Sequence, residues 1–156
     1  MARNHFLLLL FLTFTSQISA QWRPDQIEII RDHWGVPHIY APTDAQVSYG
    51  LAWAHAEDDF ETIQSTILAA KSMLGLHLGK EGAVVDYVVH LLRAKEIVEK
   101  NLPKVSPKFL KLVKGYLAGM NAYASKHPKE VLVKKAFPIT VQDVFQAYFL
   151  QLAIMD

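Results

Sequence analysis

The hydrophobic positions follow two patterns along the chain, and the first of them predicts a short β-hairpin. Residues 27–30 and 36–40 are β-branched or aromatic runs, and the segment 32–35 between them has the chemistry of a turn. Pro37 cannot donate a hydrogen bond to a ladder, so the second strand is expected to start there or to lie at an edge.

Apolar residues recur at helical spacing from residue 43 onward. Thr43 or Asp44 can cap a first helix, whose apolar stripe continues to Leu74 and whose expected end is Gly75. Two further glycines, Gly79 and Gly82, are expected to keep the connection after it loose. A second helix is predicted from about residue 83 to 102, with an inward face formed by Val84, Val88, Leu91 and Leu92.

Two more helices have clear start signals. Ser106-Pro107 opens the first, because serine is a good cap and proline suits the first helical position, and His127-Pro128 ends it. Thr140 and Asp143 have the spacing of a capping box for the last helix. The apolar stripe of that helix consists of Phe145, Tyr148, Phe149, Leu152 and Met155. The predicted fold class is therefore mostly α with a short N-terminal β-hairpin.

The stripe of the last helix continues to the end of the sequence. No glycine, basic turn or polar tail marks a stop before Asp156. An aromatic-rich face of this kind needs a surface to pack against. We therefore expect the chain to be cut short from a longer protein.

The first twenty residues have the three parts of a secretory signal peptide. Arg3 supplies the positive charge, residues 6–14 form an apolar run, and Ala20 is the small residue before an expected cut at Gln21. A membrane-spanning helix is the alternative, but a span needs about 20 apolar residues and this run has roughly half that number. The sequence thus predicts an exported protein, with residues 1–20 as a cleaved signal and 21–156 as the mature region.

Length, net charge and cysteine content exclude several classes of partner and site. Removing the first 20 of the 156 residues leaves 136, enough for one modest domain, and takes the formal net charge from +1 to zero. A neutral chain gives no reason to expect nucleic acid or an anionic membrane surface as a partner. The sequence has no cysteine, which excludes disulfides, thiolate metal sites and a cysteine nucleophile.

The densest group of ionisable residues is the segment 55–59, His-Ala-Glu-Asp-Asp. On a helix, His55, Asp58 and Asp59 share a face and could bind a metal. The alternative is a buried polar cluster that ties this helix to neighbouring backbone or to an arginine. Adjacent carboxylates without a second histidine make a poor zinc site, so we favour the structural interpretation.

The remaining polar residues give no catalytic pattern by themselves. His33 and His38 flank the predicted turn and are interpreted as hydrogen-bonded turn residues rather than bases. Four lysines fall on the polar side of the third helix and are interpreted as a solvated face: Lys104, Lys108, Lys111 and Lys114. The sequence has no Gly-x-Ser-x-Gly elbow, phosphate loop, dinucleotide glycine pattern or His-Glu-x-x-His motif.

Two longer blocks resemble the penicillin acylase (penicillin amidase) family. Residues 29–41, Ile-Ile-Arg-Asp-His-Trp-Gly-Val-Pro-His-Ile-Tyr-Ala, are similar to its opening signature. Residues 49–59, Tyr-Gly-Leu-Ala-Trp-Ala-His-Ala-Glu-Asp-Asp, resemble its second block. Asp58-Asp59 stand where many members have an arginine after the acidic residue, a feature more similar to the cephalosporin- and acyl-homoserine-lactone-acylase branches.

Three weaker matches follow in the same order as in the family. The glycines of Leu74-Gly75 and Leu78-Gly79 stand where the family has a helix end, and residues 115–123 resemble its Gly-x-Asn-Ala helix. Residues 138–144 resemble a Pro-x-Thr-x-x-Asp segment that opens the helix beside the acyl pocket. One departure is the segment 71–73, Lys-Ser-Met, which replaces a common Gly-Arg.

The resemblance implies an N-terminal-nucleophile hydrolase with a four-layer αββα fold, to which this chain contributes an incomplete α chain. Family members are made as precursors that cut themselves, and the nucleophile is a serine at the start of the β chain whose own α-amine is the base. None of the serines, at 16, 19, 48, 65, 72, 106 and 125, follows the glycine expected at such a cut. No catalytic residue and no metal ligand is therefore assigned here, although calcium is possible in the full-length family member.

The implied activity is the hydrolysis of penicillin-, cephalosporin- or acyl-homoserine-lactone-type acyl amides, in the periplasm, together with a β chain from the same precursor. By resemblance the last helix lines the acyl pocket, and Leu152 and Met155 are the candidate substrate-binding residues; both could equally be ordinary core. The chain alone is expected to be inactive. A secreted helical binding or structural module without catalysis is the alternative.

Overall fold

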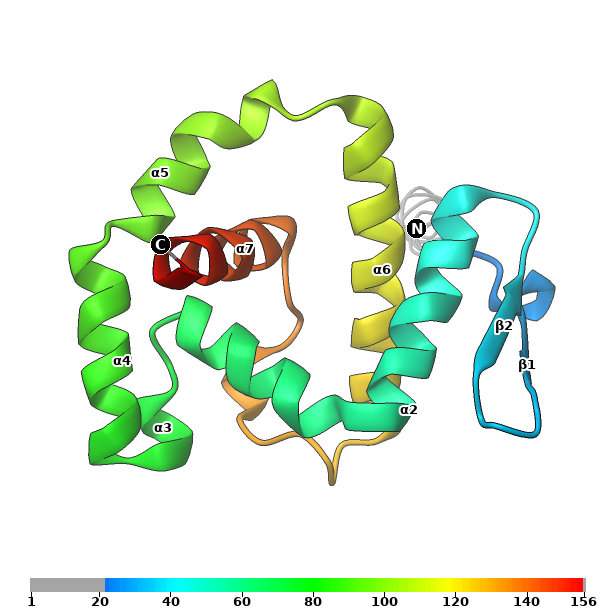
Figure 1. The fold of residues 1–156 in the computed structure, drawn as a ribbon, viewed down its shortest axis with the longest axis horizontal. Helices are drawn as coiled ribbons and strands as arrows, with labels where there is room; N and C mark the ends of the chain where they lie inside the picture. The colour runs from blue at the N-terminus through cyan, green and yellow to red at the C-terminus, as the bar shows by residue number, and fades with distance from the viewer. Residues whose placement is uncertain (1–21, 156) are drawn as a thin grey trace, which may run out of the picture.

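A computed structural model describes residues 22–155 of the protein. Figure 1 shows a mainly helical molecule in which α2 and α6 run side by side next to a hairpin of β1 and β2. The last helix, α7, lies between α6 on one side and α5 on the other (Figure 1). The predicted fold class is confirmed. No helix in the described part of the chain is long and apolar enough to cross a membrane.

The hairpin consists of β1 (Glu28–Arg31) and β2 (Pro37–Tyr40), which follow a short 3₁₀ turn, η2 (Pro24–Gln26). The strands are antiparallel, with Ile29 opposite Ile39. A carboxylate oxygen of Asp32 accepts hydrogen bonds from the backbone N–H groups of Trp34, at 2.9 Å, and Val36, at 3.0 Å. This Asx-type turn closes the hairpin where the sequence predicts it.

The close packing of α2 (Asp44–Ala70) against α6 (Pro107–Lys126) depends on two glycines of α6. A Cβ atom at Gly115 would collide with the carbonyl group of Ala45, and one at Gly119 would collide with that of Tyr49. The two contacts lie four residues apart on each helix, so the backbones touch over about one helical turn. Around this contact lies the larger hydrophobic cluster of the protein, in which Met120 is fully buried.

The first predicted helix is confirmed at its start and corrected at its end. Thr43 caps α2, but the helix bends at Asp59, where φ is −158° and ψ is 68°, and it stops at Ala70. Gly75 does not end it. Instead, Gly75 begins the short helix α3 (Gly75–Leu78), because the carboxylate of Asp86 accepts hydrogen bonds from the N–H groups of Leu74 and Gly75, both at 2.8 Å.

The predicted helix 83–102 is divided in the structure into α4 (Lys80–Leu91), α5 (Ala94–Asn101) and the 3₁₀ turn η3 (Leu102–Lys104). Arg93, with φ of +54°, breaks it. The predicted inward face is wrong for three of its residues, since Val84, Val88 and Leu91 are 60%, 44% and 60% exposed. Leu92, the fourth, is half-buried.

A glycine explains why α4 turns a different face to the core. Gly82 is not part of a loose connection but lies inside α4, where a Cβ would collide with the carbonyl group of Leu74. This close approach sets the buried face at Gly82 and Val89, two helical turns apart. The residues predicted to face inward are consequently rotated toward solvent.

The start signals of α6 and α7 (Val141–Met155) are both confirmed. The Ser106 hydroxyl accepts a hydrogen bond from the N–H of Phe109 at 3.2 Å. Thr140 and Asp143 form the reciprocal capping box: the Thr140 N–H donates to the Asp143 carboxylate at 2.8 Å, and the Asp143 N–H donates to the Thr140 hydroxyl at 3.3 Å. Between these helices, η4 (Lys134–Ala136) crosses to the second hydrophobic cluster, around Leu68 and Leu150.

Candidate functional site

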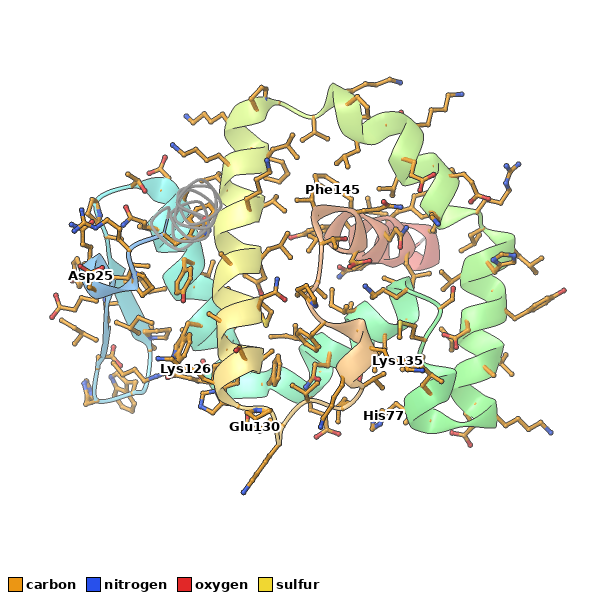
Figure 2. All side chains as sticks on the ribbon, turned by 180° about the vertical axis from the view of Figure 1, so that it is seen from behind. Asp25, His77, Lys126, Glu130, Lys135 and Phe145 are labelled. Atoms are coloured by element: carbon orange, nitrogen blue, oxygen red, sulfur yellow. The ribbon has the colours of Figure 1, made fainter. Side chains whose placement is uncertain are left out.

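An apolar groove of about 490 Å³ lies between α2, α6 and the first turns of α7. Leu51, Ile63 and Ile67 line it from α2, Leu112 and Tyr116 from α6, and Val144 and Tyr148 from α7. The rings of Phe109 and Phe145 meet edge to face beside it, with centroids 6.2 Å apart. Figure 2 shows Phe145 in the first turns of α7. A groove of this character suits an apolar group rather than a charged one.

One polar pair lies on the groove wall. The Nδ1 atom of His55 is 3.2 Å from the Tyr116 hydroxyl oxygen, and this contact joins α2 to α6. Burial raises the pKa of the Tyr116 hydroxyl, and the nearby Tyr148 adds to this effect. Tyr116 therefore stays protonated around neutral pH and can act as a neutral hydrogen-bond group at the edge of the groove.

The structure separates the three residues considered as metal ligands. His55 pairs with Tyr116, while Asp58 lies 2.8 Å from the guanidinium group of Arg31. Asp59 accepts a hydrogen bond from the N–H of Thr62 at 3.2 Å, at the bend of α2. The contact of this cluster with an arginine is confirmed, but the cluster is not buried, since the side chains of Glu57 and Asp58 are 42% and 53% exposed. In residues 22–155 no group of three histidine or acidic side chains is placed to hold a metal ion.

The guanidinium group of Arg31 joins the hairpin to α2. It contacts Glu57 at 3.2 Å and Asp58 at 2.8 Å, and it donates to the Gly35 carbonyl at 2.8 Å. Hydrogen bonds to Asp58 and then Glu57 raise the pKa of Arg31. The arginine of the first sequence block and the acidic residues of the second are therefore partners.

The other polar residues singled out in the sequence form local hydrogen bonds, ring contacts or helix caps, or face solvent. The Nε2 atom of His38 lies 3.4 Å from Asp32, and the His33 ring packs against that of Trp34 with centroids 4.4 Å apart. The four lysines from Lys104 to Lys114 are exposed, as expected for a solvated face. Ser48 donates to the carbonyl of Asp44, Ser106 is a helix cap, and Ser65 and Ser125 lie inside helices.

Two amide side chains, the partly buried Asn121 and the buried Gln64, form hydrogen bonds that the sequence pattern does not reveal. The side chain of Asn121 accepts from the N–H of Ile139 at 2.8 Å and donates to its carbonyl at 2.9 Å, which holds the segment before α7. In the same way, the Gln64 amide pairs with the Glu130 carbonyl at 3.0 Å and the Leu132 N–H at 2.9 Å. Asn121 belongs to the segment that resembles the Gly-x-Asn-Ala helix, whereas Gln64 belongs to no motif.

The predicted substrate-binding residues lie at the far end of α7. Leu152 is 66% exposed and lies one turn beyond Tyr148, which is 59% exposed; Leu152 is not among the residues that line the groove. Met155 is the last residue of α7, and its side chain is outside the described part of the structure. The predicted signal cleavage between Ala20 and Gln21 also falls outside the described residues.

The fold of residues 22–155 is similar to that of a solved penicillin acylase. A thermostable penicillin G acylase from Alcaligenes faecalis superposes with a TM-score of 0.68, at 23% sequence identity, over 81% of this chain and 72% of that one. Residues 26–151 match the penicillin amidase family. The chain belongs to the penicillin amidase family.

Curated relatives agree with this assignment. The chain is 26% identical to penicillin G acylase of Escherichia coli over 119 residues and 28% identical to penicillin acylase 2 proenzyme of Pseudomonas sp. (strain SE83) over 97 residues. It is 27% identical to the acyl-homoserine lactone acylase PvdQ of Pseudomonas fluorescens over 122 residues. These matches cover 74%, 62% and 72% of this chain. They span only 14%, 12% and 16% of the relatives.

Proposed function

We propose that this chain is the N-terminal part of an exported acyl-amide hydrolase and forms one wall of its acyl-binding pocket. The observation that carries the proposal is the outward face of α7, where Tyr148 and Leu152 are exposed beside an apolar groove. Exposed apolar faces of this kind mark surfaces that bind another molecule. The substrate class comes from the relatives, which are named as penicillin and acyl-homoserine lactone acylases.

The catalytic serine of this proposal belongs to a β chain made from the same precursor. A free α-amine has a pKa near 8, so the amino group of an N-terminal serine is sufficiently deprotonated to accept the proton of its own hydroxyl. Oxyanion donors would complete acyl transfer. The chain spans only 12–16% of the three relatives named above, which supports a nucleophile located elsewhere. Calcium is possible in the full-length enzyme, with most of its ligands in the β part.

Residues 1–20 are proposed as the signal that exports the precursor to the periplasm, with cleavage between Ala20 and Gln21. Mass spectrometry of the protein recovered from the periplasm would test this directly. A mature chain that begins at Gln21 is the expected result, and recovery of the uncleaved chain from the cytoplasm would contradict it.

Sequencing the native gene beyond Asp156 is the main test of the proposed function. We expect a Gly-Ser or equivalent processing site followed by a long, β-rich region. A stop codon without a downstream partner would instead favour the second candidate, a secreted helical binding or structural module. Purified residues 21–156 are expected to show no hydrolysis of acyl amides, and turnover by this piece alone would contradict our placement of the nucleophile.

A further inference from the structure

A second cavity, of about 600 Å³, lies on the other side of α2 from the apolar groove and runs along β1. Its walls are formed by Ile27, Ile29 and Arg31 from the hairpin, by Gly50 and Trp53 from α2, and by Lys126 from the end of α6. Figure 2 shows Lys126 on the side of α6 that faces the hairpin. No residue of β2 lines this cavity, so it follows one edge of the hairpin only.

That edge of the hairpin carries unpaired main-chain groups. The Asp32 N–H donates to the Val36 carbonyl at 3.2 Å, which places the main-chain groups of Asp32 toward the second strand. In an antiparallel ladder these groups alternate in direction from one residue to the next. Those of Ile30 therefore face β2, whereas those of Ile29 and Arg31 point away from it. Outside the β1–β2 ladder, the main-chain groups of Ile29 and Arg31 form no main-chain hydrogen bond within residues 22–155.

The opposite edge of the hairpin is less suited to pairing. The same alternation directs the main-chain positions of Pro37 and Ile39 outward from β2. Pro37 has no N–H group, and a proline at this position blocks the pairing of a further strand. The two edges of the sheet thus differ, and only the β1 edge presents two consecutive outward donors and acceptors beside a cavity.

We propose that the β1 edge accepts an extended strand from the remainder of the acylase polypeptide, which turns the hairpin into a sheet of at least three strands. An extended backbone supplies the donors and acceptors that Ile29 and Arg31 lack, and apolar side chains at alternate positions would fill the space over Ile29 and Trp53. The source of the strand rests on the proposed function, in which most of the enzyme lies beyond this chain.

The charges along the cavity indicate one further property of the incoming strand. Arg31 is already paired with Glu57 and Asp58, at 3.2 Å and 2.8 Å. Lys126 lies with its ammonium 5.4 Å from the centre of the Trp53 ring and forms no ion pair within residues 22–155. A carboxylate on the incoming strand beside Lys126 would complete this end of the cavity.

Hydrogen–deuterium exchange on the complete product of the native gene tests the proposal. In the complete protein we expect the amides of Ile29 and Arg31 to exchange at least about tenfold more slowly than the outward amide of Ile39 on β2, because each gains a hydrogen bond. Equal rates in a protein that hydrolyses acyl amides would overturn the strand site and leave the proposed function intact. Slow exchange in a protein without hydrolase activity would do the reverse.

Matched proline variants separate the two edges. Ile29→Pro removes an outward N–H from β1, and Ile39→Pro removes the equivalent group from β2, while both residues pack near Gly50. In the complete protein, Ile29→Pro is expected to speed exchange at Arg31 roughly tenfold more than Ile39→Pro does. Equal effects would overturn the assignment to β1. Protection of Ile29 and Arg31 in residues 21–156 that increases with concentration would identify a second copy as the occupant and overturn the proposed source.

Discussion

The ammonium group of Lys71 lies 2.7 Å from a carboxylate oxygen of Asp143, 72 residues further along the chain. Lys71 follows the last residue of α2, and Asp143 is in the first turn of α7. Both side chains are largely buried, at 18% and 11% exposure. The pair therefore fixes the start of the proposed pocket helix to the end of the helix that carries the second sequence block.

Removing the lysine should destabilise the chain. Lys71→Met leaves the Asp143 carboxylate buried without its counter-charge, and breaking such a pair by removing one partner costs about 3 kcal/mol. Urea denaturation followed by circular dichroism measures the loss. Asp143→Asn in the same background removes the stranded charge while keeping an oxygen for the Thr140 N–H, so it should recover part of the stability. No recovery would mean that the charge is not the cause.

Removing the Asn121 amide should destabilise the chain independently of the Lys71–Asp143 pair. Asn121→Ala leaves the N–H and carbonyl of Ile139 without these partners, which should cost about 2 kcal/mol. Asn101→Ala is the control, since Asn101 donates to the Ile97 carbonyl from an exposed position, and it should cost less than about 0.5 kcal/mol. Equal changes in the urea midpoint for both variants would contradict the role given to Asn121.

Gly115→Ala should lower the stability of the protein, although alanine has a higher helix propensity than glycine. Alanine in place of glycine inside a helix normally stabilises by about 1 kcal/mol. At Gly115 the added methyl group would collide with the Ala45 carbonyl, so α2 and α6 must move apart, and we expect a net loss of about 1–3 kcal/mol. Thermal unfolding of Gly115→Ala tests the sign, and a raised melting temperature would refute the close helix contact.

The Asp32 turn should respond to acid. Its slight burial opposes ionisation, but hydrogen bonds from the backbone of Val36 and Trp34, together with His38, outweigh it and lower the pKa of Asp32. A lowered folded-state pKa means that the stabilisation is present above the unfolded value of about 3.9 and is lost as the pH falls through the folded-state pKa. The protection of the Val36 amide, measured relative to the intrinsic exchange rate at each pH, should therefore fall in that acidic range. Asp32→Asn should abolish this pH dependence of the protection.

The elements of this fold that have local causes were predictable from the sequence. Ser106-Pro107 and the Thr140–Asp143 box act within one turn of helix, and their predicted helix starts are correct. The inward face of α4 was not predictable, because it depends on the contact of Gly82 with the distant backbone of Leu74. Apolar spacing shows that a helix has a stripe, but not whether that stripe meets the core of this chain or another surface.

In the candidate site, too, features with local causes were predictable and features that depend on distant contacts were not. The resemblance directed attention to α7, and the groove beside it has aromatic and aliphatic walls. The pairing of His55 with Tyr116, and of Asn121 with Ile139, joins residues from separate motifs and emerges only from the fold. Gln64 has no sequence signal at all, since its partners are main-chain groups whose positions depend on the path of the loop.

The final prediction separates a pocket wall from ordinary core within α7. Leu152 is 66% exposed and Leu150 is 6% exposed, so the two leucines are two positions apart on one helix but face different surroundings. Leu150→Ala should cost about 3 kcal/mol in residues 21–156 because it opens a cavity in the second hydrophobic cluster. Leu152→Ala should cost less than about 0.5 kcal/mol there.

In the complete enzyme, Leu152→Ala should change substrate selection more than Leu150→Ala does, although it costs less stability. Truncating Leu152 removes apolar surface from the proposed pocket wall, worth about 1–3 kcal/mol of discrimination between acyl groups that differ in size. We therefore expect Leu152→Ala to shift the ratio of kcat/KM between a short and a long acyl amide by roughly tenfold or more. Leu150→Ala should lower the melting temperature and leave that ratio unchanged. If Leu152→Ala leaves the ratio unchanged as well, the exposed face of α7 covers a protein surface rather than the acyl group.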